Sequence, residues 1–432
     1  MLRILNEEPT DEQFQTLINL YNGGALDKAL ERVQMLLQQF PDSARIYNVQ
    51  GAINASLENF DLAIQSYLEA VRIKPDYAQA YNNIGVSLRT CGQLEPAIQS
   101  YKQALMIKPA YAQALNNLGI ALQENGELEE AERNFRKALE IEPHYAEAYY
   151  NLGLALQDKN NLEAAKFNYL KALEIEPSYA EAHYNLGIIF LNEGENANAI
   201  MCLKNTLVFK EDSAEARHLI NALTGNTSNA PPAGYVEKLF DHYAGNFEKS
   251  LIDKLDYQTP RMLTEIIREH SQSSLGSVLD LGCGTGLIGK EIGKYCTNLH
   301  GVDLSKPMLD QAKKKNTYDK LSHYNLADFL STETLNFDYF IAADVFVYIG
   351  ELLEIFRLIK FRNSKNGRLV FSTEHTEKDG YCLENSGRYS HSRNYIDNLC
   401  RELGYRICHF STSNIRKEKN GAICGGLYLL EF

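Results

Sequence analysis

The sequence lacks three features, and each absence excludes a class of protein. No apolar run is long enough to span a bilayer, and residues Met1 to Glu8 lack the long apolar core of a signal peptide. None of the eight cysteines forms a Cys-x-x-Cys pair, so neither a zinc site nor a disulfide framework is predicted. The 43 Lys and Arg residues are outnumbered by 56 Asp and Glu, which disfavours a general nucleic-acid-binding surface. The sequence therefore predicts a cytoplasmic protein with no metal, membrane or nucleic-acid partner.

The acidic excess belongs to the first half of the chain. Up to Asn226 there are 18 Lys and Arg against 30 Asp and Glu, a net charge of −12, whereas the remainder has 25 against 26. An acidic surface suits a basic or neutral protein partner, although plain solubility explains it equally well. A length of 432 residues indicates two or three domains.

The first half contains a repeat with a period of 34 residues. A glycine, an alanine, a bulky residue and a proline recur at this step, in an order that resembles the tetratricopeptide repeat (TPR). Each unit is expected to be two antiparallel helices that cross closely at the small residues, with proline ending the second helix. We predict an all-α TPR superhelix of about six repeats plus a capping helix over residues 10–223. The recurring positions are Gly51, Gly85, Gly119, Gly153 and Gly187; Ala63, Ala97, Ala131, Ala165 and Ala199; Tyr67, Tyr101, Phe135, Tyr169 and Leu203; and Pro75, Pro109, Pro143 and Pro177.

Asparagines also recur once per repeat, in the first helix of each unit. Asparagine is a poor helix former in an interior position, so this regularity needs a reason. If these helices line the concave face, the amides form a ladder that can pair with the backbone of a bound peptide. This resembles the asparagine ladder of the TPR superhelix in O-GlcNAc transferase. The alternative is that each amide satisfies carbonyls of neighbouring helices. The predicted peptide-binding ladder is Asn83, Asn117, Asn151 and Asn185.

A domain boundary is predicted at residues 224–234, which are rich in Gly, Pro, Ser and Asn and cannot hold a helix. Beyond it, residues 235–432 show about seven apolar strands alternating with helical patterns. The last two strands, Gly404 to Ser411 and Cys424 to Phe432, are expected to form a terminal antiparallel hairpin. The second half is therefore predicted to be an α/β domain.

The segment from Val278 to Ile292 carries the strongest functional signal. An apolar run leads to Asp280, and Gly282, Gly284 and Gly286 follow at alternate positions, so the loop turns sharply and lets a ligand approach the helix start. This G-x-G-x-G spacing differs from the dinucleotide fingerprint G-x-G-x-x-G. It resembles motif I of class I S-adenosylmethionine (SAM) methyltransferases. The alternative is a glycine turn in another α/β domain.

The resemblance implies a Rossmann-like class I methyltransferase fold with a seven-stranded sheet, and it assigns roles to residues at the strand ends. Asp303 would take the ribose hydroxyls of SAM, and Leu304 would face the adenine. Asp328 would hydrogen-bond the adenine amino group, and Phe329 would stack on its ring. Asp344 ends a buried central strand at the edge of the active-site crevice.

Two further residues complete the predicted cofactor set. Cys283 lies within the glycine loop. Tyr243 belongs to an Asp-x-Tyr-Ala-x-x-Phe segment that resembles the N-terminal lid of many small methyltransferases, where this tyrosine closes over the cofactor. Packing of the aromatic side chain on the sheet is the alternative for Tyr243.

The long segment after the fifth strand is expected to lie above the strand ends and to select the methyl acceptor. His375 and His391 are candidates for a general base, because histidine titrates near neutral pH. Arg388 could bind an anionic group of the substrate, and Tyr348 and Tyr389 could line the pocket. For each of these residues a packing or surface role is the alternative, and His391 could instead cap the following helix.

Nearly the whole chain resembles a group of predicted methyltransferases with N-terminal TPRs. The segments that carry this resemblance are Leu-Phe-Asp-His-Tyr-Ala, Ala-Asp-Val-Phe-Val-Tyr-Ile-Gly and Gly-Arg-Tyr-Ser-His-Ser. The resemblance implies SAM-dependent methyl transfer to a protein or small-molecule acceptor, with the TPR array as a protein- or peptide-binding arm. The alternatives are a scaffold whose methyltransferase-like domain only binds SAM or its product, and an array that only forms oligomers.

Overall fold

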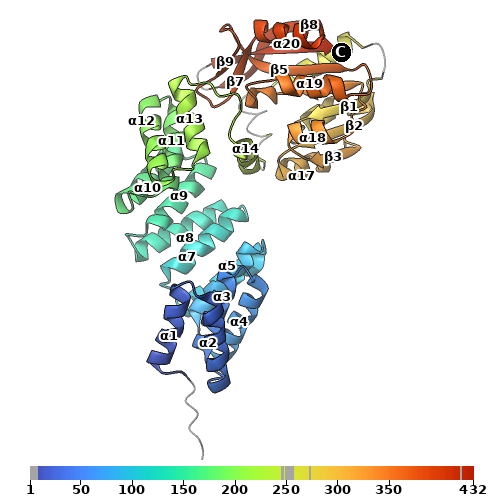
Figure 1. The fold of residues 1–432 in the computed structure, drawn as a ribbon. Helices are drawn as coiled ribbons and strands as arrows, with labels where there is room; N and C mark the ends of the chain where they lie inside the picture. The colour runs from blue at the N-terminus through green and yellow to red at the C-terminus, as the bar shows by residue number, and fades with distance from the viewer. Residues whose placement is uncertain (1–7, 245–247, 249–256, 272–273, 419–420) are drawn as a thin grey trace, which may run out of the picture. The chain divides into compact units, whose positions relative to one another are not determined.

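The computed structural model describes residues 8–244, 248, 257–271, 274–418 and 421–432 (Figure 1). The chain divides into two compact units, Met1–Glu195 and Asn196–Phe432. Among the helices of the described residues, none has both the length and the apolar character needed to cross a membrane.

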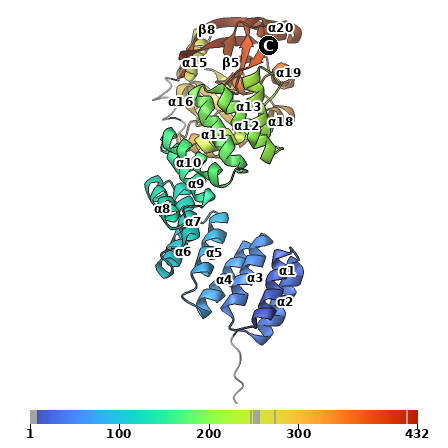
Figure 2. The same cartoon turned by 90° about the vertical axis from the view of Figure 1, so that its left-hand side faces the viewer.

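The first unit is a series of antiparallel helix pairs, as Figure 2 shows. Within each pair the two helices pack on one another, and the second helix also packs on the first helix of the next pair. The predicted all-α repeat array is confirmed. Its helices are α1 (Asp11–Asn22), α2 (Leu26–Gln39), α3 (Ala44–Ser56), α4 (Phe60–Ile73), α5 (Ala78–Thr90), α6 (Leu94–Ile107), α7 (Ala112–Glu124), α8 (Leu128–Ile141), α9 (Ala146–Asp158), α10 (Leu162–Ile175) and α11 (Ala180–Glu193).

In four of the repeats, the glycine of the first helix lies directly under the aromatic ring of the second helix. This close contact gives a steric reason for the recurrence of both residues every 34 positions. A Cβ atom added to Gly119 would lie 2.5 Å from Cε1 of Phe135, far inside van der Waals contact. Three other repeats have the same 2.5 Å approach between the glycine of the first helix and the tyrosine of the second. Only a residue without a side chain permits this packing, so the glycine and the ring recur together. The other pairs are Gly51 with Tyr67, Gly85 with Tyr101, and Gly153 with Tyr169.

We expect Gly119→Ala to destabilise the repeat array by about 1–3 kcal/mol, because the added methyl group forces the fully buried Phe135 ring to move. Urea unfolding of the full chain, followed by helical circular dichroism, measures this loss. Adding Phe135→Leu makes room for the methyl group and should recover part of the stability. An unfolding curve for Gly119→Ala that matches the wild type would contradict the steric explanation.

The ladder asparagines hydrogen-bond from one repeat to the preceding one. Nδ2 of Asn117 donates to Oδ1 of Asn82 at 3.0 Å. The acceptor is thus a side chain of the adjacent repeat, and not the helix carbonyl that we considered as the alternative to peptide binding. Each amide has a second N–H group, so these bonds leave donor capacity at the ladder. The same step joins Asn83 to Asn48 at 3.1 Å, Asn151 to Asn116 at 3.0 Å, and Asn185 to the hydroxyl of Tyr150 at 3.1 Å.

The second unit begins with two helices that the repeat pattern assigns to the array, α12 (Asn196–Phe209) and α13 (Ala214–Thr224). By compactness these helices group with the α/β domain. The domain limits 10–223, 224–234 and 235–432 follow the sequence repeat, and they stay a prediction.

Nine strands of the described residues form one sheet with the order β3-β2-β1-β4-β5-β7-β6, and β9 pairs with both β5 and β8. The neighbours from β3 to β7 in this order run parallel, while β8 and β9 form the predicted terminal antiparallel hairpin. The α/β class I fold is confirmed, and β6 and β7 are additional to the expected seven strands. The strands are β1 (Gly276–Leu281), β2 (Cys296–Asp303), β3 (Lys320–His323), β4 (Tyr339–Ala342), β5 (Arg368–Thr376), β6 (Tyr381–Leu383), β7 (Tyr389–Ser392), β8 (Arg406–Glu418) and β9 (Gly421–Glu431).

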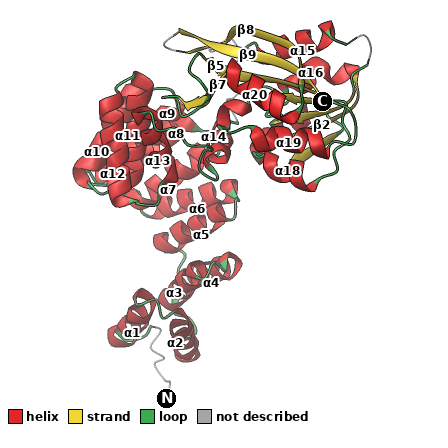
Figure 3. Ribbon diagram, turned by 45° about the horizontal axis from the view of Figure 1, so that its top comes forward, coloured by secondary structure: helices red, strands yellow, loops and turns green. Residues whose placement is uncertain are grey.

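Helices cover both faces of the sheet (Figure 3). Alternate residues of each strand supply the two cores, so that Ile341 of β4 packs against α15 and α16, whereas Phe340 and Ala342 pack in the core formed with α18, α19 and α20. This layering leaves the carboxyl ends of the parallel strands exposed at one edge, where α/β proteins bind ligands. The helices are α14 (Tyr235–Tyr243), α15 (Thr259–Glu269), α16 (Leu287–Ile292), α17 (Lys306–Lys314), α18 (Leu326–Thr332), α19 (Leu353–Arg362) and α20 (Arg393–Leu403).

Candidate functional site

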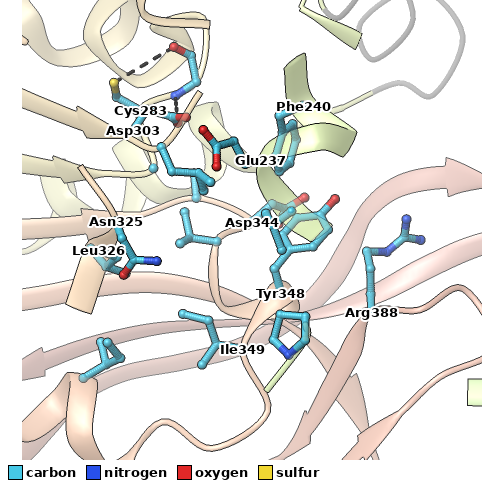
Figure 4. Close-up of a pocket in the computed structure, with 18 of the residues that line it drawn as sticks. Glu237, Phe240, Cys283, Asp303, Asn325, Leu326, Asp344, Tyr348, Ile349 and Arg388 are labelled. Atoms are coloured by element: carbon cyan, nitrogen blue, oxygen red, sulfur yellow. Dashed lines mark hydrogen bonds between the residues drawn. The ribbon is translucent and has the colours of Figure 1, made fainter. Parts of the chain in front are cut away.

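A cavity of about 500 Å³ lies at the carboxyl ends of β1, β2 and β4 (Figure 4). This volume is in the range of small-molecule sites in proteins. Its walls come from the loops after these three strands, the start of α18, the linker at residues 230–234, and α14. The linker between the repeats and the α/β domain is therefore part of the site.

The glycine loop after β1 forms the inner wall. Gly282, Gly284 and Gly286 all have positive φ angles, of 65°, 53° and 87°. A Cβ atom on Gly282 would lie 2.6 Å from Cγ2 of Val345, whereas nothing lies within 4 Å of the Cβ position of Gly284. Gly282, Cys283 and Gly284 line the cavity, and Gly286 is the N-cap residue of α16. The predicted loop thus combines tight backbone packing with open space for a ligand.

Asp303, at the end of β2, is held by backbone donors on both carboxylate oxygens. Oδ2 accepts the N–H of Gly284 at 2.8 Å, and Oδ1 accepts the N–H of Ser305 at 2.8 Å. The hydroxyl of Ser305 donates to Oδ1 of Asp241 on α14 at 2.6 Å. Burial raises the pKa of Asp303, and the backbone hydrogen bonds oppose this effect. A carboxylate is thereby fixed in the cavity wall, with Leu304 beside it.

Asp280 lines the same wall and is almost completely buried. The hydroxyl of Tyr318 donates to its Oδ2 at 2.6 Å and accepts the N–H of Gly289 at 3.1 Å. Burial raises the pKa of Asp280 to about 7, and the nearby Asp303 charge acts in the same direction, against the hydrogen bond from Tyr318. A cation bound in the cavity would favour the ionised form of this carboxyl.

The adenine contacts expected from Asp328 and Phe329 are not supported by their positions. Oδ1 of Asn325 caps α18 by accepting the N–H of Ala327 at 2.9 Å, and Asn325, Leu326 and Ala327 line the cavity. Asp328 is exposed and outside this lining, and Phe329 points into the hydrophobic core. Because the helix begins at Leu326, Phe329 falls on its inner face. At this point in the chain the cavity lining consists of the three residues that precede the Asp-Phe pair.

A chain of four charged side chains borders the cavity on the side of β4 and β5. Nη1 of Arg416 donates to Oδ2 of Asp344 at 2.9 Å, and Nη2 donates to Oε1 of Glu374. Nε of Arg388 donates to the same glutamate oxygen at 2.6 Å. The hydroxyl of Ser372 donates to Oδ1 of Asp344 at 2.8 Å. Asp344, Arg388 and Arg416 line the cavity, so its charged wall is already internally paired.

The two histidines predicted as general bases do not line the cavity. Alternation along β5 places His375 on the opposite face from Glu374, where its Nε2 lies 3.3 Å from Oε1 of Glu377. His391 is fully buried, and its Nε2–H donates to the carbonyl of Gly350 at 2.9 Å. Burial lowers the pKa of His391 to about 4, so its ring is neutral at physiological pH. The ring of His375 also packs near Phe410 and that of His391 near Tyr395, with centroids 6.1 Å and 5.7 Å apart, so both histidines make structural contacts away from the cavity lining.

The predicted tyrosines have different places. Tyr348 lines the cavity, and its ring packs edge-on against Phe240 of α14, with centroids 5.1 Å apart (Figure 4). Tyr389 is buried outside the lining, where its hydroxyl lies 2.8 Å from Oγ of Ser228. The side chain of Tyr243 lies outside the described residues.

Several residues at or beside the cavity carry no signal in the sequence. Glu237 and Tyr257 line the cavity, and Tyr318 holds Asp280 from the segment between α17 and β3. Glu374 and Arg416 come from β5 and β8 and meet only in the folded sheet. None of the five belongs to a short motif, so only tertiary structure brings Glu237, Tyr257 and Arg416 to the cavity, and Tyr318 and Glu374 to residues that line it.

Comparisons with known proteins give matches in both halves of the chain. A family model described as a methyltransferase domain matches residues 279–369, and models of the tetratricopeptide repeat match residues 51–90, 87–126, 110–178 and 168–201. Human methyltransferase-like protein 27 is 35% identical over 88 residues, which cover 19% of this chain and 35% of that protein. Malonyl-[acyl-carrier protein] O-methyltransferase of Legionella pneumophila is 29% identical over 142 residues, 32% of this chain and 49% of that protein. The chain thus spans less than half the length of each of these two relatives.

One solved structure shows a partial likeness to this chain. The crystal structure of MamA is 25% identical, with a TM-score of 0.35, and the match covers 38% of this chain and 96% of that one.

Proposed function

Because this chain joins tetratricopeptide repeats to a methyltransferase domain, we propose that its cavity binds SAM and that the protein transfers the methyl group to a protein or small-molecule acceptor. The observation that carries this proposal is the cavity itself. It brings a glycine loop and the two acids Asp280 and Asp303 together at the carboxyl ends of β1 and β2.

The donor set of this wall fits the chemistry of SAM. The Asp303 carboxylate, fixed by two backbone N–H groups, would hold the ribose hydroxyls. Asp280 would face the positive charge of the cofactor, and Leu304 and Leu326 supply apolar surface for the adenine. Open space beside Gly284 lets a ligand approach the backbone. When bound, SAM supplies an electrophilic methyl group on a sulfonium.

On the acceptor side, we expect the chain to align the acceptor with the methyl group. Phe240 and Tyr348 form an aromatic wall, and the prolines Pro231 and Pro232 line the cavity from the linker. Holding the acceptor in line with the methyl group accounts for most of what an enzyme adds to such a displacement. The malonyl-carrier relative is an O-methyltransferase by name, so an oxygen nucleophile is the first acceptor class to test.

The repeat array is proposed as an arm that holds a protein or peptide. Its ladder of Asn83, Asn117, Asn151 and Asn185 uses one N–H of each amide between repeats, so carbonyl oxygens and second N–H groups can serve a peptide backbone. Such an arm would deliver either the acceptor itself or a partner protein that supplies it.

Methyl-labelled SAM incubated with the protein and a host-cell lysate tests the proposal, with Asp303→Ala as the control. Label in a protein band that disappears with the variant indicates a polypeptide acceptor, and label in the small-molecule pool indicates a metabolite. Bound SAM without label in either fraction would favour the scaffold alternative over an enzyme.

We expect SAM affinity to fall as the pH drops below about 7, by about tenfold per pH unit. Burial raises the pKa of Asp280 from an ordinary value of 3.8 to about 7, so below about pH 7 the free protein holds a proton on this carboxyl. That proton must leave before the carboxylate can pair with a cation, and its removal weakens binding at low pH. Titrations from about pH 5.5 to about pH 7.5 stay below the pKa of the amino group of SAM.

The Asp280→Asn variant is the control for this pH dependence. It should bind SAM more weakly than the wild type and with little change across the same pH range. An equally steep pH dependence in Asp280→Asn would show that another group is responsible.

A further inference from the structure

The hairpin of β6 and β7 (Tyr381–Ser392) contacts α13 and the linker on one side and the cavity on the other. Three consecutive residues near its turn divide these contacts. Gly387 and Tyr389 bind α13 and the linker, whereas Arg388 between them lines the cavity. Arg388 lies on the same side of the cavity as Tyr348 (Figure 4), so the hairpin connects the last helix of the repeat pattern with the proposed methyl-acceptor side.

His218 of α13 makes the central contact. Its side chain is buried, with a relative exposure of 3%, and its Nε2–H donates to the carbonyl of Gly387 at 3.0 Å. Gly387 has a φ of 78°, and a Cβ atom there would lie 3.0 Å from the hydroxyl of Tyr235 and 3.2 Å from Cδ2 of Leu219. The backbone of the hairpin turn is thus pressed against α13 and held by a buried hydrogen bond.

The linker fastens the rest of the hairpin. The hydroxyl of Tyr381 donates to Oδ1 of Asn229 at 2.8 Å, and the N–H of Leu383 donates to Oγ1 of Thr227 at 3.2 Å. Ala222 of α13 shares a buried cluster with Leu383 and Tyr389. These contacts come from both strands of the hairpin, so they fix its orientation as well as its position.

On the side that faces the cavity, the hairpin contributes Arg388 to the set of four paired charged side chains at the cavity wall. Nε of Arg388 donates to Glu374, which also accepts from the buried Arg416. A displacement of the Gly387 backbone would therefore move the Arg388 guanidinium relative to Glu374. Because hydrogen bonds depend steeply on distance and angle, a small displacement changes this side of the cavity.

We propose that α13 helps to shape the methyl-acceptor site. In this proposal His218 is a positioning residue: it holds the backbone of Gly387 and thereby fixes the position of the Arg388 side chain. The proposal rests on the proposed function for its effect on methyl transfer, but not for its effect on the hairpin. His218 has no direct hydrogen bond to the cofactor wall, formed by Asp280, Asp303 and the glycine loop, and it reaches this wall only through α14: its ring packs against Tyr235, with centroids 4.9 Å apart, and Asp241 of the same helix accepts from Ser305. We therefore expect the position of α13 to act mainly on the acceptor side and to change SAM binding little.

Hydrogen exchange of the full chain tests this link with three variants. In His218→Ala, amides of the hairpin between residues 383 and 392 should exchange about tenfold faster, because a buried hydrogen bond that holds them is lost. In His218→Gln exchange should return towards the wild-type rate, because the glutamine amide N–H can donate to the same carbonyl. Arg217→Ala is the matched control, since this exposed neighbour donates to the carbonyl of Glu211 instead.

Two functional measurements accompany the exchange experiment. SAM affinity of His218→Ala should stay within about twofold of the wild type, while methyl transfer in the lysate should fall about tenfold and recover in His218→Gln. Unchanged exchange in the hairpin, or equally faster exchange in β1 and β2, would overturn the proposal. So would unchanged methyl transfer by His218→Ala in a lysate that the wild type labels. If the wild type labels nothing, the proposed function fails, and the exchange of the hairpin alone decides this inference.

Discussion

Replacing Asp303 by alanine is expected to weaken SAM binding on the order of 100-fold. The carboxylate is fixed by the N–H groups of Gly284 and Ser305, and Asp303 lines the cavity where we propose that the ribose hydroxyls lie. A hydrogen bond to a charged group contributes about 1.5–3 kcal/mol, so two such bonds contribute about 3–6 kcal/mol, and a net loss of about 2.7 kcal/mol after partial recovery by water corresponds to about 100-fold. Isothermal titration of SAM into the full chain measures the change.

Two companion variants make this result specific. Asp303→Asn keeps an acceptor for one backbone N–H and loses the charge, so it should fall between the wild type and alanine. Asp328→Ala alters the residue that the methyltransferase resemblance assigns to adenine, but Asp328 is exposed and outside the cavity lining. We expect Asp328→Ala to bind SAM like the wild type. A large loss of affinity in Asp328→Ala would show that the adenine lies elsewhere than the cavity wall suggests.

Replacing Arg416 by methionine is expected to destabilise the second unit by about 3–5 kcal/mol. Its guanidinium is almost fully buried and pairs with both Asp344 and Glu374. Removing it leaves two carboxylates in a low-dielectric interior with fewer donors, which costs more than the lost attraction alone. Urea unfolding of the protein without SAM, followed by a probe in the α/β domain, measures the effect.

Two further variants show how much of this destabilisation comes from the buried charges: one removes a surface ion pair, and the other also neutralises Glu374. Arg261 pairs with Glu265 at 2.9 Å, but both side chains are exposed, so Arg261→Met should cost no more than about 1 kcal/mol. Combining Arg416→Met with Glu374→Gln removes one of the stranded charges and should recover part of the stability. If Arg416→Met unfolds at the same urea concentration as the wild type, the buried charged chain does not hold the ends of β4, β5 and β8 together.

Local patterns in the sequence predicted the parts of the structure that depend on local rules. The glycine and ring positions were predictable because one residue without a side chain must lie under one ring in each repeat, and the pair repeats at a fixed step. The loop at Gly282 and Gly284 and the acid Asp303 were predictable because strand, turn and helix start follow each other within a short segment. These features depend on residues close in sequence.

Features that depend on distant residues were not predictable in this way. Tyr318, which holds Asp280, carries no motif, and Arg416 meets Glu374 only because β8 and β5 both flank β9. The β6–β7 hairpin has strands of only three and four residues, too short for a clear alternation. Histidines attract attention in a sequence because of their titration, but strand alternation and burial decided that His391 packs against Gly350.

The measurement that tests the central claim most directly is a calorimetric titration of SAM into the full-length wild-type protein at about pH 7.5. We predict saturable binding at one site per chain, displaced by S-adenosylhomocysteine, and weakened by Asp303→Ala as described above. No saturable binding up to about 1 mM SAM, with a correctly folded protein, would contradict the assignment of the cavity to this cofactor. The proposed methyl transfer, and with it the role of Arg388 on the methyl-acceptor side of the cavity, would then lose their basis. The contact between His218 and the hairpin would stand.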